Sequence, residues 1–422
     1  MKTRTNPIGK IHNADARDLD RVMKGHRVDV TITSPPYFDL KDYGHKKQIG
    51  FGQKYPAYLA DLKDVFKKTH DITKDTGTLW VIIDTFRRKG EIYTLPFDFA
   101  RELKGTGWIL QEIIIWRKER TVPWSKKGQM RGLIEYILVF KKSENFKYRI
   151  DRIRDYSDLK QWWVKYPERY NPKGKTPTEI WSFDIPTQGS WGNGYVDHFC
   201  PLPEGLVKQI IDLTTDEGDV VFDPFAGSGT VPAQAVFTKR KYAGFELNAR
   251  YIKMFKKHIK KNTKRRLKEY ANSKINSKQV NFQKQILNLR ALKFADVLKK
   301  NLDKIFPEYI TNVYVRDKNK KPSVLNKLIT IEYTLLLKNK KSFAALKKEI
   351  AKMVANPPLS KFGIQSEFIF IFDVKEFQKK IYTRNLYGYN ANKTNKLTAT
   401  VQKNEITKYP FLSKIRNEVT EK

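Results

Sequence analysis

Short runs of β-branched and aliphatic residues alternate with longer amphipathic stretches through the first 250 positions. A buried strand is predicted at residues 28–33, where the run stops abruptly at two prolines. Further strand-like runs lie at residues 79–83, 109–116, 136–140, 220–222 and 241–247. Helical patterns lie at residues 58–68, 97–104, 202–213 and 249–261. This alternation predicts an α/β fold whose sheet is covered by helices on both faces.

The alternation is interrupted between residues 144 and 195. Arginine, lysine and tryptophan are mixed there with proline and glycine, and no period is evident. We expect an inserted, loop-rich region. Its side chains suited to guanine edges or to phosphates are Arg152, Arg154, Lys165, Arg169, Lys173 and Lys175. The alternative is a folded subdomain with a basic rim.

Positive charge is concentrated in the C-terminal part of the chain. The formal net charge is +37, and residues 251–422 hold 40 Lys and Arg against 13 Asp and Glu. A field of this sign attracts polyanions such as nucleic acid or acidic lipid. Residues 253–268 are dense in lysine and arginine, and they could form either a phosphate-binding surface or a solvated helix face. Beyond residue 280 the pattern predicts helices at 281–305 and 341–354 and strands at 328–337 and 368–372.

Several classes of protein are disfavoured by what the sequence contains. The single cysteine, Cys200, excludes an intramolecular disulfide framework and a Cys-rich zinc cluster. No apolar run approaches the roughly eighteen residues of a membrane span. We therefore expect a cytoplasmic protein that does not associate with a membrane. His198 has no other candidate ligands near it, so no metal site is predicted.

Two motifs directly follow predicted strands. They are Thr33-Ser34-Pro35-Pro36-Tyr37 and Asp223-Pro224-Phe225-Ala226-Gly227-Ser228-Gly229-Thr230. In an open parallel sheet, ligands bind outside the carboxyl ends of the strands. The glycines of the second motif let the backbone pass close to a ligand, and Glu246, at the end of the next strand, suits the hydroxyls of a ribose.

The glycine-containing loop differs from the loops that hold pyrophosphates. Thr230-Val231 follows the last glycine where a nucleoside triphosphate site requires Lys and then Ser or Thr. Pro232 stands where a dinucleotide fingerprint has its third glycine. A nucleoside ligand without a pyrophosphate therefore fits better, and a plain turn is the alternative.

The proline motif makes a second chemical demand. Pro35 and Pro36 supply no N–H donors, which leaves the Ser34 hydroxyl and the Pro35 carbonyl as rigid acceptors. Such acceptors could hold an exocyclic amino group, and the Tyr37 ring offers a face on which a planar base can stack. The alternative is an ordinary turn at the end of a strand.

Together these motifs resemble the S-adenosylmethionine-dependent DNA amino-methyltransferases of restriction–modification systems. With the proline motif first, the order resembles the permuted group called beta. The resemblance spans about residues 10–260. Asn13-Ala14-Asp15-Ala16 is similar to the segment whose acid contacts the cofactor adenine, and residues 198–204 are similar to the segment that opens the cofactor pocket. Residues 262–422 show no such similarity.

The resemblance implies a Rossmann-like methyltransferase sheet and a set of site residues. It places the catalytic core at residues 1–143 and 196–261 and target recognition at 144–195, followed by a basic α+β region at 262–422 that we expect to bind nucleic acid. The catalytic residues are Ser34, Pro35, Pro36 and Tyr37. The residues expected to bind S-adenosylmethionine are Asp15, Ala16, Ser34, His198, Pro201, Asp223, Pro224, Phe225, Gly227, Gly229, Thr230, Glu246, Leu247 and Asn248.

The implied reaction is methyl transfer to the exocyclic amino group of a base flipped out of double-stranded DNA. Serine at position 34 resembles the cytosine-N4 branch, and adenine N6 is the alternative. Methylation of a cytosine ring carbon would need a thiolate, and the one thiol, Cys200, lies in the cofactor segment. A cognate restriction endonuclease is a candidate partner.

Two other interpretations stay open at this point. One is a non-catalytic DNA-binding protein on a methyltransferase scaffold. The other is a nuclease fused after residue 262, for which Glu332, Glu367, Asp373 and Lys375 supply the residue types of a magnesium site.

Overall fold

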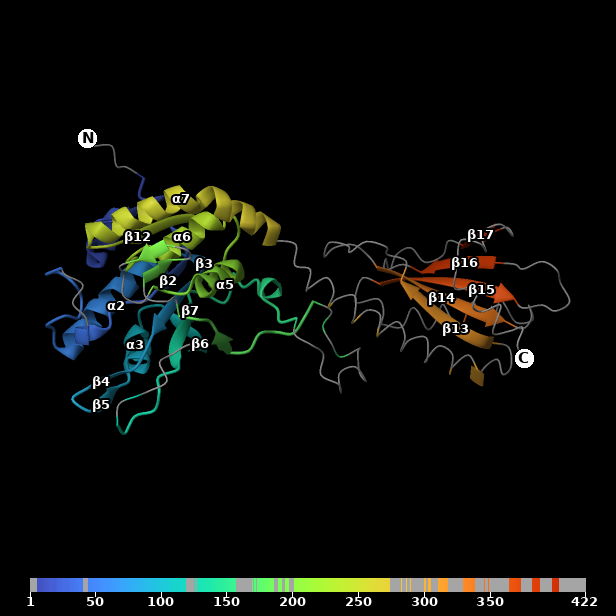
Figure 1. The fold of residues 1–422 in the computed structure, drawn as a ribbon, viewed down its shortest axis with the longest axis horizontal. Coiled ribbons are helices and arrows are strands. Elements are labelled where there is room, and N and C mark those ends of the chain that lie inside the picture. The colour runs from blue at the N-terminus through green and yellow to red at the C-terminus, as the bar shows by residue number, and fades with distance from the viewer. Residues whose placement is uncertain are drawn as a thin grey trace. The chain divides into compact units, whose positions relative to one another are not determined.

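The structure of the chain is a computed structural model. It describes residues 6–40, 45–118, 125, 127–156, 169, 171, 173–185, 189–191, 194–196, 201–273, 282, 286, 289, 300, 303–304, 310–317, 329–337, 345, 348, 364–372, 382–387 and 397–401. The chain divides into two compact units: Met1–Arg154 with Thr176–Lys274, and Asp155–Lys175 with Ile275–Lys422 (Figure 1). The predicted recognition region at 144–195 is thus shared between the two units.

The first unit is built on an eight-stranded sheet with the order β1-β12-β11-β2-β3-β7-β6-β8. The strands are β1 (Lys10–His12), β2 (Val28–Thr33), β3 (Thr73–Ile83), β6 (Ile109–Arg117), β7 (Ile134–Lys141), β8 (Ile180–Ser182), β11 (Val220–Asp223) and β12 (Lys241–Phe245). Every pairing in this sheet is parallel except those of β7, which runs antiparallel to β3 and to β6. The carboxyl ends of β2, β11 and β12 therefore meet at one rim.

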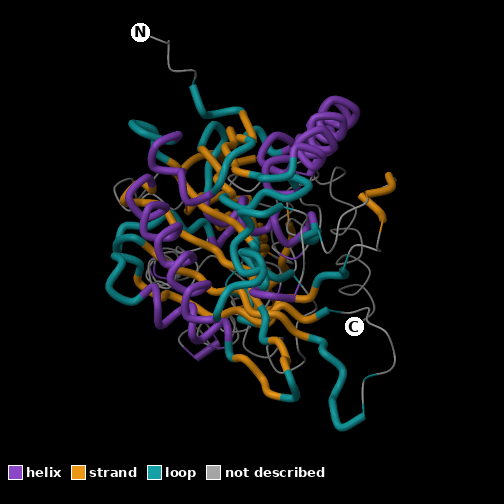
Figure 2. Tube along the Cα trace, turned by 90° about the vertical axis from the view of Figure 1, so that its left-hand side faces the viewer, coloured by secondary structure: helices purple, strands orange, loops and turns teal. Residues whose placement is uncertain are grey.

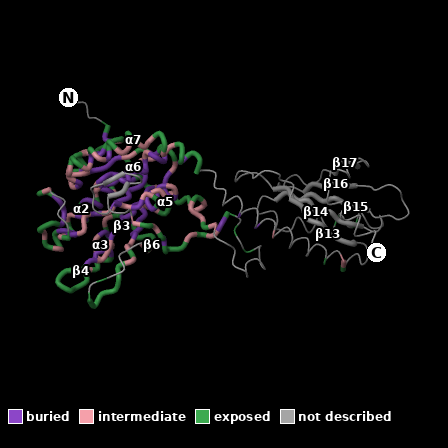
Figure 3. The backbone as a smooth tube through the Cα atoms, in the orientation of Figure 1, coloured by how far each residue is buried: buried purple, intermediate pink, exposed green. Residues whose placement is uncertain are grey.

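Helices cover both faces of this sheet, which confirms the predicted α/β arrangement (Figure 2). They are α1 (Leu19–Val22), α2 (Tyr55–Ile72), α3 (Leu95–Leu103), α5 (Glu204–Thr214), α6 (Thr230–Phe237) and α7 (Ala249–Ser273). Successive residues of β3 show why both faces are apolar: Leu79 and Val81 pack with α1, α2 and α3, while Trp80 packs with α5 and α6. Both sets of side chains are buried (Figure 3).

Short 3-10 helices lie at Ala16–Asp18, Phe38–Leu40 and Ile150–Arg152, and short strands pair outside the main sheet. Strands β4 (Phe86–Arg88) and β5 (Glu91–Tyr93) form a hairpin, and β9 (Gly189–Trp191) pairs with β10 (Gly194–Val196). Among the described residues, no helix is both long and apolar enough to cross a bilayer.

The second unit contains a five-stranded sheet with the order β13-β14-β15-β16-β17. Its strands are β13 (Ile310–Asp317), β14 (Ile329–Leu337), β15 (Ile364–Phe372), β16 (Tyr382–Tyr387) and β17 (Leu397–Val401). Only β14 and β15 pair in parallel. They lie where strands were predicted, whereas most of the two predicted helices, at 281–305 and 341–354, falls outside the described residues. Of the nuclease candidates, Glu332 and Glu367 are register partners, and Asp373 and Lys375 are not described.

Candidate active site

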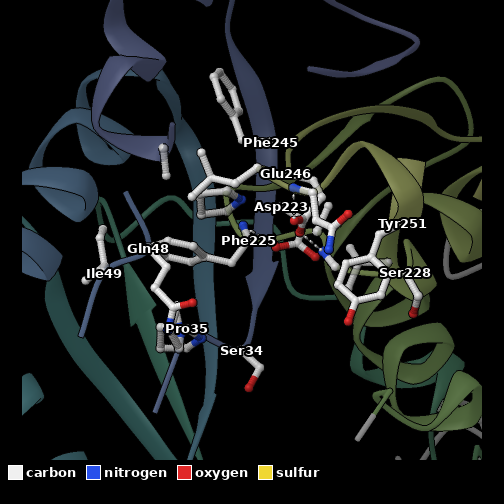
Figure 4. Close-up of a pocket in the computed structure, with 18 of the residues that line it drawn as sticks. Ser34, Pro35, Gln48, Ile49, Asp223, Phe225, Ser228, Phe245, Glu246 and Tyr251 are labelled. Atoms are coloured by element: carbon white, nitrogen blue, oxygen red, sulfur yellow. Dashed lines mark hydrogen bonds between the residues drawn. The ribbon is translucent and has the colours of Figure 1, made fainter. Parts of the chain in front are cut away.

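The two sequence motifs meet at one pocket on the sheet rim. Ser34–Tyr37 follows β2, the glycine loop joins β11 to α6, and Glu246 follows β12. A hydrogen bond links the motifs directly, because Thr33 Oγ1 donates to Asp223 Oδ1 at 2.6 Å. In Figure 4, Ser34 and Pro35 lie on one side of the pocket and Glu246 lies across from them.

Most of the site residues expected from the sequence line this pocket. They are Asp15, Ala16, Ser34, Pro35, Pro36, Tyr37, Pro201, Asp223, Pro224, Phe225, Gly227, Thr230, Glu246, Leu247 and Asn248. Gly229 is not among the lining residues, and His198 lies outside the described residues. Further lining residues that the sequence did not single out include His45, Gln48, Ile49, Leu202 and Tyr251.

Gly229 has a packing function beneath the pocket. Its φ of +87° lies in the left-handed region that favours glycine, and it caps the N-terminus of α6. A Cβ at this position would lie 2.5 Å from Phe255 Cδ2 of α7. The glycine therefore lets α7 pack closely against the loop.

Glu246 is held in place by the backbone of the glycine loop and of its own turn. The Gly227 N–H donates to Glu246 Oε2 at 2.8 Å, and the Asn248 N–H donates to Oε1 at 2.7 Å. Burial raises the pKa of Glu246, and these backbone hydrogen bonds oppose that rise. Each carboxylate oxygen keeps acceptor capacity for a ligand.

Asp223 is almost fully buried between the two motifs. Its Oδ1 accepts hydrogen bonds from Thr33 Oγ1 and from the Phe225 N–H, the latter at 3.0 Å. Burial raises the pKa of Asp223 to about 7; the two hydrogen bonds lower it, and the negative charge of Glu246 adds to the rise. Among the described residues, no cationic side chain pairs with Asp223 or Glu246.

Asp223 is buried and Glu246 is half-buried, and two such acids that no described cation neutralises suit a cationic ligand. S-adenosylmethionine carries a sulfonium, an ammonium and the vicinal hydroxyls of a ribose, so its chemistry fits this donor and acceptor set. Asp15 differs from these acids, because Arg17 binds its carboxylate at 2.8 Å. Burial would raise the pKa of Asp15, but the hydrogen bonds and charge of Arg17 outweigh burial and lower it.

The proline motif is fixed from behind by α2. Tyr58 donates to the Pro36 carbonyl at 2.7 Å. The ring of Phe38 packs in an aromatic cluster with Tyr55, Tyr58, Phe86 and Tyr93. The Ser34 hydroxyl and the Pro35 carbonyl therefore belong to a rigid turn.

A charged cluster that the sequence did not reveal lies behind Tyr37. The Tyr37 hydroxyl donates to Glu135 Oε2 at 3.2 Å, and Lys118 Nζ pairs with Glu135 Oε1 at 2.6 Å. Asp84 lies 4.0 Å from Lys118, and its pKa is raised to about 6 by burial and by the charge of Glu135. The available signal was the position of these acids: Asp84 follows β3 and Glu135 is the second residue of β7, and β3 and β7 are the next two strands beyond β2 in the sheet.

The basic residues expected to contact DNA lie in varied surroundings. Arg152 donates to the Thr215 carbonyl at 2.6 Å and pairs with Asp216, so it holds the segment after β7 to the core. Arg154 pairs with Asp151 at 2.7 Å, and Lys175 pairs with Asp155 at 2.9 Å. Lys165 lies outside the described residues, whereas Arg169 and Lys173 are described. The DNA contacts of this set stay a prediction.

The sheet order, the rim pocket and its paired motifs define an enzyme of the Rossmann-like methyltransferase class. Residues 28–257, more than half of the chain, match the model of the DNA methylase family, which is named for N6 and N4 methyltransferases. The chain belongs to this family. That membership confirms the resemblance to DNA amino-methyltransferases and the expectation of an enzyme.

Individual relatives and one solved structure align with more than half of the chain. It is 27% identical over 272 residues to the Type II methyltransferase M.XycI of Xanthomonas campestris pv. cyanopsidis, covering 57% of this chain and 84% of the relative. It is 28% identical over 282 residues to the Type II methyltransferase M.SmaI of Serratia marcescens, covering 59% and 90%. The solved structure of the cytosine-N4-specific PvuII DNA methyltransferase aligns with a TM-score of 0.48 at 20% identity, covering 67% of this chain and 94% of that chain.

Proposed function

We propose that this DNA methylase methylates the exocyclic N4 amino group of cytosine in double-stranded DNA, with S-adenosylmethionine as the methyl donor. The observation that carries the proposal is the shared pocket, in which acceptors of the proline motif face the acids and glycines of the donor side. The serine at position 34 favours cytosine over adenine.

Different side chains of the pocket bind the methyl donor and the target base. The bound donor supplies a methyl group on a positively charged sulfur. Glu246 holds the ribose hydroxyls, and Asp223 offers negative charge near the cationic part of the donor. The target amino group lies inside a duplex, so the base must be flipped out. Tyr37 then stacks on the base.

Ser34 and Pro35 orient the amino group for attack. The amino nitrogen of cytosine is conjugated with its ring and is a poor nucleophile. By accepting hydrogen bonds from its N–H groups, the Ser34 hydroxyl and the Pro35 carbonyl favour a more tetrahedral nitrogen with its lone pair directed at the methyl group. Proximity and orientation supply much of the acceleration.

The same proposal extends to the biological setting. The relatives named above are Type II methyltransferases, so we propose a cytoplasmic enzyme that protects DNA against a cognate restriction endonuclease. Residues 144–195 would read the target sequence, and residues 262–422 would bind nucleic acid.

Nucleoside mass spectrometry after reaction with DNA and S-adenosylmethionine tests the proposal. We expect N4-methylcytosine from the wild-type protein and from Ser273→Ala, a matched serine change at the end of α7. Ser34→Ala should form much less product. N6-methyladenine as the product would overturn the choice of base, and DNA left unmethylated across many sequences would overturn the proposed activity.

A further inference from the structure

Helix α7 presents one face to the core and a markedly different face to solvent. Ile252, Phe255 and Tyr270 are buried, and the first two pack with Phe237 of α6. From Lys253 onward, eight exposed side chains of this helix are lysine or arginine: Lys253, Lys256, Lys257, Lys260, Lys261, Lys264, Arg265 and Lys268. We call these eight residues the α7 basic face.

Little in the described protein neutralises this charge. Arg265 pairs with Glu269, but the seven lysines form no ion pair with any described residue. Lysines spaced four residues apart, such as Lys253 and Lys257, repel one another and weaken an isolated helix. Because this pattern works against the stability of the helix, a functional reason for it is expected.

The positive charge of α7 also affects a half-buried histidine. His258 lies on the inner side of α7 and contacts the ring of Phe237. Burial, together with the charges of Arg266 and Arg265, lowers the pKa of His258 to about 4. The histidine therefore stays neutral at physiological pH and adds no charge of its own to the helix.

The chemistry of the α7 basic face favours the backbone of a duplex over other polyanions. The apolar residues of α7 are packed against the core, so the helix has no apolar face to insert into a membrane. The fully exposed positions of α7 hold no aromatic residue, whereas proteins that hold single strands stack bases on aromatic rings. From Lys253 to Lys268 the face extends about 22 Å at 1.5 Å per residue. That length is roughly two thirds of a turn of B-DNA.

The position of α7 connects this face to the substrate. Tyr251, in the first turn of the helix, lines the active-site pocket, so α7 begins at the edge of that pocket. The lysines start two residues later and continue away from the pocket. DNA that flanks the target could therefore follow the helix without entering the pocket.

We propose that the α7 basic face is a sequence-independent binding site for the phosphate backbone of duplex DNA flanking the methylated site. The inference rests on the enzyme acting on DNA and not on which base it methylates. In this proposal the α7 basic face raises the affinity for DNA and keeps the enzyme on long DNA. The pocket determines which base is methylated and carries out methyl transfer.

Binding of the full-length chain to two duplexes over a range of salt concentrations tests this site. One duplex covers the target alone, and the other adds long flanks. The test variant carries Lys253→Gln, Lys257→Gln, Lys260→Gln and Lys264→Gln. The control variant removes the same charge from other exposed positions of the first unit, with Lys24→Gln, Lys63→Gln, Lys67→Gln and Lys104→Gln.

For the long duplex, the test variant should reduce the slope of log affinity against log salt by about 3 to 4, since each lost phosphate contact removes about 0.9. The short duplex and S-adenosylmethionine should bind it as they bind the wild type. The control variant should change both duplexes equally and only slightly. A variant with arginine at the same four positions should restore the slope, and it shows that any loss does not come from misfolding.

Three results would overturn the inference. The first is a wild-type salt slope for the test variant on the long duplex. The second is an equal reduction in the test and control variants, which would reflect only the overall charge. The third is a test variant that loses more affinity for single-stranded RNA than for duplex DNA. The product identified by mass spectrometry bears on none of these outcomes, so failure here is separable from failure of the proposed methylation.

Discussion

Replacing Glu246 with glutamine removes a negative charge from the donor side of the pocket and keeps the length of the side chain. In the wild-type protein the Glu246 carboxylate accepts one backbone hydrogen bond on each oxygen, from Gly227 and from Asn248. Glutamine has a single carbonyl oxygen, so one of these N–H groups would face an amide NH₂. The ribose hydroxyls of the donor would also lose a charged acceptor.

The magnitude follows from the kind of bond that is lost. A hydrogen bond to a charged group contributes about 1.5–3 kcal/mol. At 1.4 kcal/mol per factor of ten, the Kd of S-adenosylmethionine should rise roughly 10- to 150-fold. Isothermal titration calorimetry measures this directly. Glu102→Gln is the matched control, because Glu102 lies on α3 in a surface pair with Lys63, and it should leave the Kd unchanged. A wild-type Kd in Glu246→Gln would refute the assignment of Glu246 to the donor.

Three further outcomes are expected from the described contacts. Gly229→Ala should destabilise the protein by about 2–4 kcal/mol, because it combines backbone strain with a steric clash, and thermal unfolding should show a smaller loss for Gly90→Ala, where the same φ of +87° meets no neighbour within 4 Å. Donor affinity should rise with pH through about 7 and level off about one unit higher, since a cationic ligand favours ionised Asp223 and its pKa is about 7; titrations of Asp223→Asn that keep the full pH dependence would contradict this. Glu135→Gln should slow methyl transfer while sparing donor binding, because Glu135 holds the Tyr37 hydroxyl, and a loss of donor affinity instead would place Glu135 on the wrong side of the pocket.

The strands and the motif positions could be predicted because their signals are local. The run at residues 28–33 matches β2 at both ends, and the two prolines that follow it explain why the strand stops there. The rule that ligands bind at the carboxyl ends of parallel strands then placed both motifs at one rim. The C-terminal end of α7 was harder to predict. Its apolar spacing weakens after Ile259, and the helix extends to Ser273, well beyond the predicted residue 261.

The charged cluster behind Tyr37 could not be predicted from local patterns. Lys118 directly follows β6 and Glu135 lies near the start of β7, so these two meet across one antiparallel pair. They reach Asp84 and Tyr37 only because β7 also pairs with β3, in the order β2-β3-β7-β6. That sheet order is a long-range property without a sequence motif. The same holds for Gly229, whose contact with Phe255 depends on how α7 returns over the glycine loop.

The most direct measurement pairs Tyr37→Ala with Glu246→Gln and records two quantities for each: the equilibrium affinity for S-adenosylmethionine and the single-turnover rate of methyl transfer at saturating donor. Loss of base stacking, at about 1–3 kcal/mol, should lower transfer in Tyr37→Ala by roughly 5- to 150-fold with donor affinity intact. Glu246→Gln should show the opposite pattern, with weak donor binding and a transfer rate that recovers at high donor concentration. If both variants lost donor affinity equally, or if Tyr37→Ala transferred at the wild-type rate, the division of one cleft into a donor side and a base side would be contradicted.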